Sequence, residues 1–233
     1  MFMPFDPMYL VLVLLPGLLI SGLASFMVKS AFNRYSQVRS MRGMTGAQAA
    51  QVLLDQAGIG DVRIVPAQGF LSDHYNPLTK ELALSEQVYS SNSVAAIGVA
   101  THEAGHAIQH ATHYLPLWVR SALVPMASIG SNLGLIVMAV GLMLSKVVVL
   151  VGAVLFGAVL LFQLVTLPVE FNASSRAKRL VVEAGIVYPE ERGGIDAVLN
   201  AAALTYVAAA VSTLLTLVYY LLRAGLLGGS QDE

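Results

Sequence analysis

The sequence predicts a mostly helical membrane protein, in which an α+β domain is joined to a bundle of four transmembrane helices. Of the 233 residues, 56% are hydrophobic and 12% are charged, whereas soluble domains carry about 25% charged residues. Most of the hydrophobic excess lies in four long apolar stretches, and nearly all the charge lies in two polar segments between them. This distribution is typical of a membrane protein with an extramembrane domain.

Cysteine content and net charge exclude several classes of protein. The chain has no cysteine, which excludes disulfide scaffolds, cysteine zinc sites and cysteine nucleophiles. The net charge is −1, and no run of basic residues suits a nucleic-acid groove. We therefore expect no nucleic-acid partner.

The apolar stretches are long enough to cross a bilayer, which takes roughly 20 apolar residues. The first has no Lys or Arg before it and exceeds the roughly 7–15 residues of a signal-peptide core, so we expect an uncleaved anchor. Only Ser145 and Lys146 separate the second from the third, which predicts a transmembrane hairpin. The stretches cover residues 8–28, 117–144, 147–167 and 201–227.

Positive charge predicts the orientation of these spans. All but two of the 13 Lys and Arg residues lie on the side of the two polar segments, and the exceptions are Lys146 and Arg223. Because cytoplasmic loops carry an excess of Lys and Arg, both polar segments are expected in the cytoplasm. The predicted parts are an anchor (1–28), the α+β domain (29–116), the hairpin (117–168), a helix and loop (169–200), and a fourth span with a short tail (201–233).

The first polar segment predicts helix, strand, strand and helix in that order. Thr45 can cap a helix over about residues 46–57. Residues 62–65 alternate apolar and charged side chains, as a half-buried strand does. Residues 81–84 predict a second strand, and Asn76-Pro77 marks a turn between the two.

A long helix is expected at the end of this segment. Ser93 is a favoured N-cap residue, and the helix continues to about His113, before the break that Pro116 marks. Gly105 lies within it, although glycine costs roughly 0.8–1.0 kcal/mol relative to alanine inside a helix. We therefore expect another backbone to approach closely at Gly105.

This helix contains the residues that predict a metal site and a catalytic base. Residues four apart lie on one face of a helix, roughly 6 Å apart along its axis. The imidazoles of His102 and His106 can therefore converge on one ion at zinc–nitrogen distances near 2.0–2.1 Å. Glu103 lies beside them and can reach a water on the metal without binding the metal itself. This HExxH arrangement predicts zinc and a glutamate general base, and the alternative is a helix whose two histidines only pack.

A catalytic zinc usually has three protein ligands, so a third must lie elsewhere. Thr112 occupies the position where a metzincin has histidine, and His110 lies roughly 12 Å along the helix axis from His102. Asp73 and His74 are possible third ligands, but they lie in a turn region. Glu170 follows the third apolar stretch, two spans after His106, and an even number of spans returns the chain to the same side. Glu170 is therefore the expected third ligand, with an ordinary interfacial carboxylate as the alternative.

Three further features could contribute to a substrate site. His74 and Tyr75 precede the second strand and could donate hydrogen bonds to a developing oxyanion, with packing in a turn as the alternative. Arg176 could have the same role, although a basic residue beside a span more often determines topology. The strand over residues 81–84 is expected to lie along the cleft and to pair with an extended peptide.

Several segments carry a resemblance to a known family: Ser72-Asp73-His74-Tyr75-Asn76-Pro77, residues 93–101, and Pro168-Val169-Glu170-Phe171-Asn172-Ala173-Ser174. They resemble the YugP-type neutral zinc metallopeptidases of bacterial membranes over nearly the whole chain. The resemblance implies a gluzincin-type site of two His and one Glu, in the cytoplasmic (inner) membrane of a prokaryotic cell.

A more distant likeness is to the HtpX-type membrane proteases, in which an Asp follows the ligand Glu by four residues. That position is Ser174 here, so the expected carboxylate partner of a ligand histidine is missing. Metal-bound histidines usually have such a partner. Asn172 and Ser174 are the two candidates to replace it, and the sequence does not choose between them.

The expected fold is thus a zincin-like domain on the bundle, and the expected function is a zinc-dependent endopeptidase of membrane or membrane-proximal proteins. Zinc would polarise the scissile carbonyl, and Glu103 would move the water proton to the leaving amine. A non-proteolytic zinc-binding scaffold or chaperone is the alternative, although it has no need of Glu103. An intramembrane metalloprotease is disfavoured because no Asp lies in a later span, and a di-iron bundle because it needs a second Glu-x-x-His unit.

Overall fold

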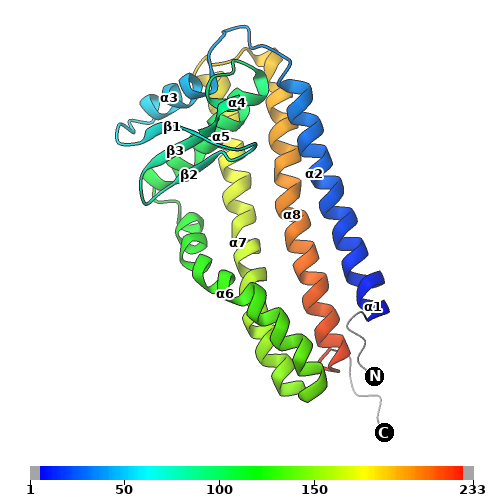
Figure 1. The fold of residues 1–233 in the computed structure, drawn as a ribbon. Helices are drawn as coiled ribbons and strands as arrows, with labels where there is room; N and C mark the ends of the chain where they lie inside the picture. The colour runs from blue at the N-terminus through cyan, green and yellow to red at the C-terminus, as the bar shows by residue number, and fades with distance from the viewer. Residues whose placement is uncertain (1–5, 228–233) are drawn as a thin grey trace. The chain divides into compact units, whose positions relative to one another are not determined.

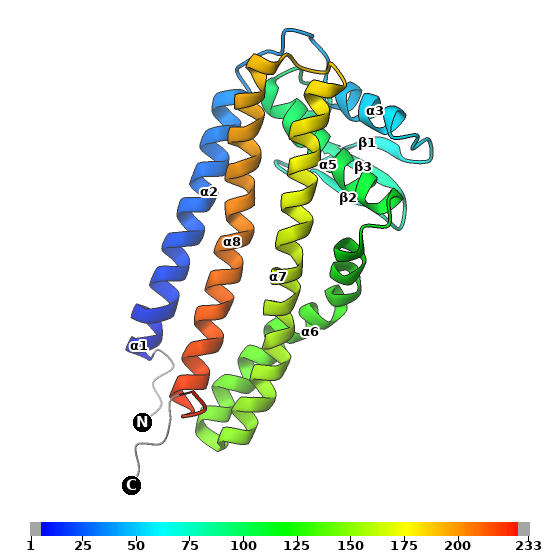
Figure 2. The same cartoon turned by 180° about the vertical axis from the view of Figure 1, so that it is seen from behind.

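The computed structural model describes residues 6–227, so the first residues of the predicted anchor (1–5) and the end of the predicted tail (228–233) lie outside the described part. Helices make up most of the structure (Figures 1 and 2). The chain divides into two compact units. The helical unit comprises Met1–Ala24, Val119–Leu167 and Thr205–Glu233, and the mixed unit comprises Ser25–Trp118 and Pro168–Leu204.

Among the described residues, four helical segments are long and apolar enough to cross a membrane. These four candidate spans agree in length and composition with the four apolar stretches that the sequence predicts to cross the membrane. The segments are α1 (Pro7–Tyr9) with a π-helical turn (Leu10–Leu14) and α2 (Leu15–Tyr35), then α6 (Leu115–Leu144), then α7 (Lys146–Glu183), and last a 3-10 turn (Pro189–Glu191) with α8 (Arg192–Arg223).

Helix α7 extends well beyond the third apolar stretch. It continues through Pro168 to Glu183, although proline removes a backbone N–H and favours a break. A fully buried stripe at helical spacing follows the proline, consisting of Val169, Ala173, Ala177 and Val181. Packing of this stripe in the mixed unit stabilises the continuation of the helix beyond the apolar residues.

The helices of the mixed unit begin where their caps predict. In α3 (Gly46–Gln56), the Thr45 side chain accepts from the backbone N–H of Gln48, and the Gln48 side chain accepts from the backbone N–H of Thr45. In α5 (Val94–Ala111), the Ser93 hydroxyl accepts from the N–H of Ala96. Both capping predictions are confirmed. A short helix, α4 (Glu86–Tyr89), precedes α5 and has no counterpart in the prediction.

A three-stranded sheet accompanies these helices (Figure 1). Its order is β1 (Arg63–Ala67), β3 (Glu81–Ser85) and β2 (His74–Asn76), with β1 parallel and β2 antiparallel to β3. The expected pairing of residues 81–84 with a peptide is wrong, because β3 is the central strand and both of its edges are occupied. The outer edges belong to β1 and β2, and β2 was not predicted as a strand.

One hydrophobic core holds the mixed unit together. Residues of α3, α5 and β3 pack there against the later part of α7 and the first turns of α8. Among its fully buried members are Leu53, Leu54, Leu84, Ile97, Val181 and Ile195. Helix α5, with the His102–His106 motif, is thereby packed on several sides, which fixes the position of its side chains.

In the helical unit, α6 and α7 form the predicted hairpin through close backbone contact. A Cβ added at Gly130 would lie 2.2 Å from the carbonyl oxygen of Leu155, and one at Gly141 would lie 2.6 Å from the backbone nitrogen of Val149. Only glycine fits at these positions, and small residues are how helices approach closely in lipid. Elsewhere in this unit, Asp6 accepts a hydrogen bond from the Tyr219 hydroxyl and forms an ion pair with Arg223.

Candidate metal centre

His102 and His106 on α5 converge with Glu170 on α7. The Oε2 atom of Glu170 lies 3.2 Å from Nε2 of His102 and 3.5 Å from Nε2 of His106. One ligand atom from each residue lies within 4.8 Å of the other two. Tetrahedral zinc with bonds of 2.0–2.1 Å sets its ligand atoms roughly 3.3 Å apart. Two of the three pairs of ligand atoms therefore already have about the spacing of zinc ligands, and the third pair lies within 4.8 Å.

The close approach of α5 to α7 makes this convergence possible. A Cβ added at Gly105 would lie 2.9 Å from the carbonyl oxygen of Ala173 and 3.3 Å from its Cα. The prediction that another backbone approaches at Gly105 is confirmed, and that backbone is α7. A larger residue at Gly105 would push α7 away and carry Glu170 away from the two histidines.

A fully buried amide, that of Gln109, determines which nitrogen of His106 carries hydrogen. Its Nε2 donates to the carbonyl oxygen of Val169 at 2.8 Å and to Oδ1 of Asn172 at 3.0 Å. Since a carbonyl oxygen can only accept, Gln109 must present Oε1 to Nδ1 of His106, 3.0 Å away. His106 therefore carries its hydrogen on Nδ1, which leaves the Nε2 lone pair directed toward Glu170.

Arg176 fixes the other end of this network. Its Nε donates to Oδ1 of Asn172 at 2.8 Å. A guanidinium has donors and no acceptor, so Asn172 presents its oxygen to both Arg176 and Gln109. The predicted oxyanion role of Arg176 remains a prediction, whereas its contact with Asn172 gives it a place in the orientation of His106.

The second histidine has its own partner. Oγ of Ser174 lies 3.1 Å from Nδ1 of His102. The sequence did not choose between Asn172 and Ser174 as the partner of a ligand histidine. In the structure both act, because Ser174 contacts His102 directly and Asn172 acts on His106 through Gln109. Sequence reasoning missed Gln109, for which the only signal was its position one turn after His106.

The arrangement fits a divalent cation. With hydrogen on Nδ1, neutral His106 directs a lone pair at a carboxylate oxygen, and the two groups attract each other only when a proton or a metal cation lies between them. Two imidazole nitrogens and one carboxylate oxygen are a ligand set that zinc accepts, with a fourth position left for water or substrate. The residues present therefore fit zinc.

Glu103 is buried beside His102 on α5. A second carboxylate, that of Asp73, lies near it at the end of the loop before β2. Burial raises the pKa of Asp73 and the charge of Glu103 raises it further, while hydrogen bonds from Ser85 oppose this. The Ser85 backbone N–H donates to Asp73 at 2.8 Å. The loop before β2 is thereby tied to the end of β3, within electrostatic range of Glu103.

The structure separates the two predicted oxyanion donors. His74 is exposed, and its Nδ1 lies 2.9 Å from the carbonyl oxygen of Ser72, within its own turn. Oη of Tyr75 lies 2.8 Å from Nδ1 of His110, one helical turn beyond His106. Burial lowers the pKa of His110 and raises that of Tyr75, so both side chains favour their neutral forms in this hydrogen-bonded pair. A catalytic role for either residue remains a prediction.

Comparison with known proteins agrees with this geometry. Residues 10–225 match the family described as "Putative neutral zinc metallopeptidase". The chain is also 42% identical over 216 residues to "Putative membrane protease YugP" of Bacillus subtilis (strain 168), covering 92% of this chain and 96% of that protein. No solved structure matches the chain significantly. Since the match extends over nearly all of its length, the chain belongs to this family of neutral zinc metallopeptidases.

Proposed function

We propose that this protein is a membrane-embedded zinc-dependent endopeptidase. The observation that carries the proposal is the convergence of His102, His106 and Glu170 on one point, with Glu103 on the same helix as the histidines. The family and the protease name of the Bacillus subtilis relative support it. In this proposal the mixed unit is a zincin-like domain, which is supported by the position of the histidine motif on a helix packed with a small sheet.

Each residue has a defined part in the proposed reaction. Zinc, when bound, supplies a Lewis acid that polarises the scissile carbonyl and lowers the pKa of water. The carboxylate of Glu103 takes a proton from the attacking water as the new C–O bond forms. When the C–N bond breaks, Glu103 gives that proton to the leaving amine. Ser174 and Gln109 hold the two imidazoles in the required orientation throughout.

The free edge of β2 is the proposed binding position for an extended peptide. Strand β2 lies against α5, as the contact of Tyr75 with His110 shows, and its outer edge has no partner strand among the described residues. Strand addition at this edge would lay a peptide along the helix that carries the histidines. The Tyr75 hydroxyl would then leave its contact with His110 and donate a hydrogen bond to the oxyanion.

The site is proposed to face the cytoplasm of a prokaryotic cell. Support comes from the excess of Lys and Arg on the side of the two polar segments. The substrates would then be membrane proteins, or peptides and proteins close to the inner membrane, because the chain itself has four candidate spans.

Replacement of the base tests the proposal against a non-proteolytic zinc scaffold. Glu103→Gln keeps the shape of the side chain but cannot accept the proton. The purified variant should keep stoichiometric zinc and its thermal transition, and should lose peptide hydrolysis by orders of magnitude. Hydrolysis at the parent rate, or loss of zinc, would reject the role of Glu103. A parent protein that binds zinc and cleaves no peptide from a membrane-protein library would favour the scaffold.

A further inference from the structure

The turn between β2 and β3 presents an apolar side chain to solvent. Leu78 is 94% exposed, more than any other large hydrophobic side chain among the described residues. The turn is well defined, because Oδ1 of Asn76 accepts hydrogen bonds from the backbone N–H groups of Leu78 at 2.9 Å and Thr79 at 3.4 Å. A structured turn that holds a leucine outward differs from the scattered exposed leucines of ordinary surfaces.

A second exposed apolar group lies at the start of α6. Leu115 and Trp118, in its first turn, are 71% and 47% exposed. The Trp118 ring lies 5.4 Å from that of His110, between ring centroids, and 6.2 Å from that of His113. Helix α6 is one of the candidate spans, so its first turn is where the chain would enter the bilayer. Tryptophan is enriched at that level of a membrane.

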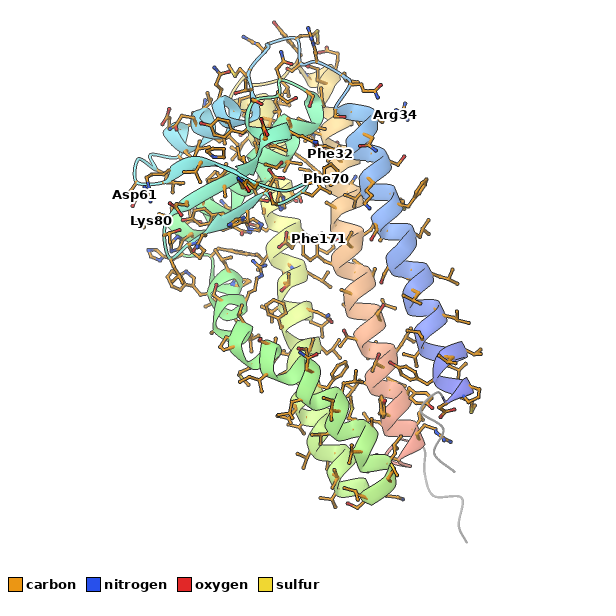
Figure 3. The ribbon with its side chains drawn as sticks, in the orientation of Figure 1. Phe32, Arg34, Asp61, Phe70, Lys80 and Phe171 are labelled. Atoms are coloured by element: carbon orange, nitrogen blue, oxygen red, sulfur yellow. The ribbon has the colours of Figure 1, made fainter. Side chains whose placement is uncertain are left out.

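The two groups are connected through side chains of the mixed unit. Trp118 contacts His110, and His110 is hydrogen-bonded to Tyr75 in β2. Leu78 follows Tyr75 by three residues, which span at most roughly 10 Å. Lys80, which ends the turn, is paired with Asp61 (Figure 3). The two exposed apolar groups are therefore linked through Tyr75 and His110, and the charge of Lys80 is paired with that of Asp61.

From these observations we infer that the turn Asn76–Lys80 enters the interfacial layer of the lipid bilayer beside the first turn of α6. The occupant of this surface is lipid, because the second apolar group lies in the first turn of a candidate span and includes a tryptophan at the level of the interface. The paired charges of Lys80 and Asp61 imply that insertion does not depend on anionic headgroups. The inference is independent of peptidase activity.

The composition of the chain gives two clean probes. It has no cysteine and a single tryptophan. A Leu78→Cys variant of the full chain can carry an environment-sensitive fluorophore at one position, and Trp118 can be followed in the unmodified protein. Both are reconstituted into zwitterionic phosphatidylcholine vesicles that contain lipids with bromine or a spin label at known depths. Gln56→Cys, at the exposed end of α3, is the matched control.

We expect shallow spin-labelled lipids to quench the fluorophore at position 78, and brominated lipids to quench Trp118. The depths in the bilayer obtained for the fluorophore and for the Trp118 ring should agree within a few ångströms. The fluorophore at position 56 should respond to aqueous iodide alone. Iodide quenching at position 78 equal to that at position 56 would overturn the inference. A blue-shifted fluorophore that no lipid quencher reaches would indicate a protein contact, which also overturns it, as would a Trp118 that brominated lipids leave unquenched.

Discussion

The side chain of Gln109 donates a hydrogen bond of 2.8 Å to the backbone carbonyl of Val169, the residue immediately before Glu170. A single amide therefore contacts both His106 and the backbone that carries the proposed third ligand. Its two functions are the choice of the His106 tautomer and the alignment of α7 with α5. Both depend on the same side chain, so its replacement should affect the metal more than the fold.

Replacement of Gln109 by methionine should weaken zinc binding. Methionine keeps nearly the same length and volume but can neither accept from Nδ1 of His106 nor donate to Val169. Loss of such a partner typically costs 10–100-fold in metal affinity, which chelator competition on the detergent-purified variant measures. Gln51→Met, the same change on the exposed face of α3, is the control. Equal zinc affinity in the two variants would refute the orienting role of Gln109.

Gly105→Ala should destabilise the protein and lower its zinc affinity. The new Cβ would meet the backbone of Ala173 at 2.9 Å, and overpacking of this kind costs about 1–3 kcal/mol. Gly193→Ala is the matched control, because nothing lies within 4 Å of its Cβ position and alanine favours a helix. Thermal unfolding of both variants decides the matter: the Gly193 variant should unfold at or above the parent temperature, and the Gly105 variant below it.

Removal of the proposed third ligand should cost zinc and stability together. Glu170→Ala leaves two protein ligands, and metal that binds only the folded state contributes about 2.7 kcal/mol at a concentration of 100 times Kd. Glu183→Ala, an exposed carboxylate at the end of the same helix, should change neither quantity. Zinc analysis and unfolding with and without chelator are the measurements. A zinc-replete Glu170→Ala protein would exclude Glu170 from the ligand set.

The emission of Trp118 should change with pH because of His110. Burial, and then the charges of Lys80 and His113, hold the pKa of His110 below its ordinary value of 6.5, with Asp61 opposing them. A lowered pKa means that the fold favours neutral His110, so its contribution to stability is present above pH 6.5 and is lost as the pH falls through the lower folded value. Protonation also places a cation beside the indole.

A titration of Trp118 emission in zinc-saturated buffer checks this expectation, with a midpoint below 6.5. His110→Gln should remove the transition. His113→Gln should retain it, because the His113 variant keeps the Tyr75–His110 pair. A transition that survives in the His110 variant and disappears in the His113 variant would show that His113 causes the change in emission, and would reject the prediction.

Single cysteines test the proposed orientation, since the native chain has none. Ser145, between α6 and α7, should become labelled in intact cells by a membrane-impermeant thiol reagent after replacement by cysteine. Gln56→Cys should become labelled only after the cells are opened. Labelling of position 56 from outside would place the metal centre on the wrong side of the membrane for the proposed substrates.

Local chemistry was enough to predict much of the fold. The caps at Thr45 and Ser93 follow from short-range rules of hydrogen bonding, and the structure confirms them. The four apolar stretches follow from hydrophobic length, and the structure has helical candidate spans there. Strand β2 was missed because His74, Tyr75 and Asn76 are too few to show an alternating pattern. The length of α7 was missed because hydropathy marks where a helix meets lipid, whereas residues 168–183 are helical through packing in the mixed unit.

In the candidate site too, some residues could be predicted from the sequence and others could not. The spacing of His102 and His106, and the return of the chain to one side of the membrane at Glu170, were sufficient to identify three residues that the structure brings together. Gln109 could not be identified, because a glutamine in a helix is ordinarily exposed and only the approach of α7 buries it. The close approach at Gly105 also depends on tertiary packing, but it could be predicted, because the cost of glycine in a helix itself indicates a close neighbour.

The separation of His102 from Glu170 by 68 residues has a consequence for biosynthesis. Both histidines and Glu103 leave the ribosome before the α6–α7 hairpin is made, and Glu170 leaves after it. A nascent chain therefore lacks the proposed third ligand until both hairpin helices have been synthesised, and a chain truncated after residue 167 should purify without stoichiometric zinc. Proteolytic capacity would then arise only once the hairpin is available for membrane insertion, so that incomplete chains could not cleave other proteins in the cytosol.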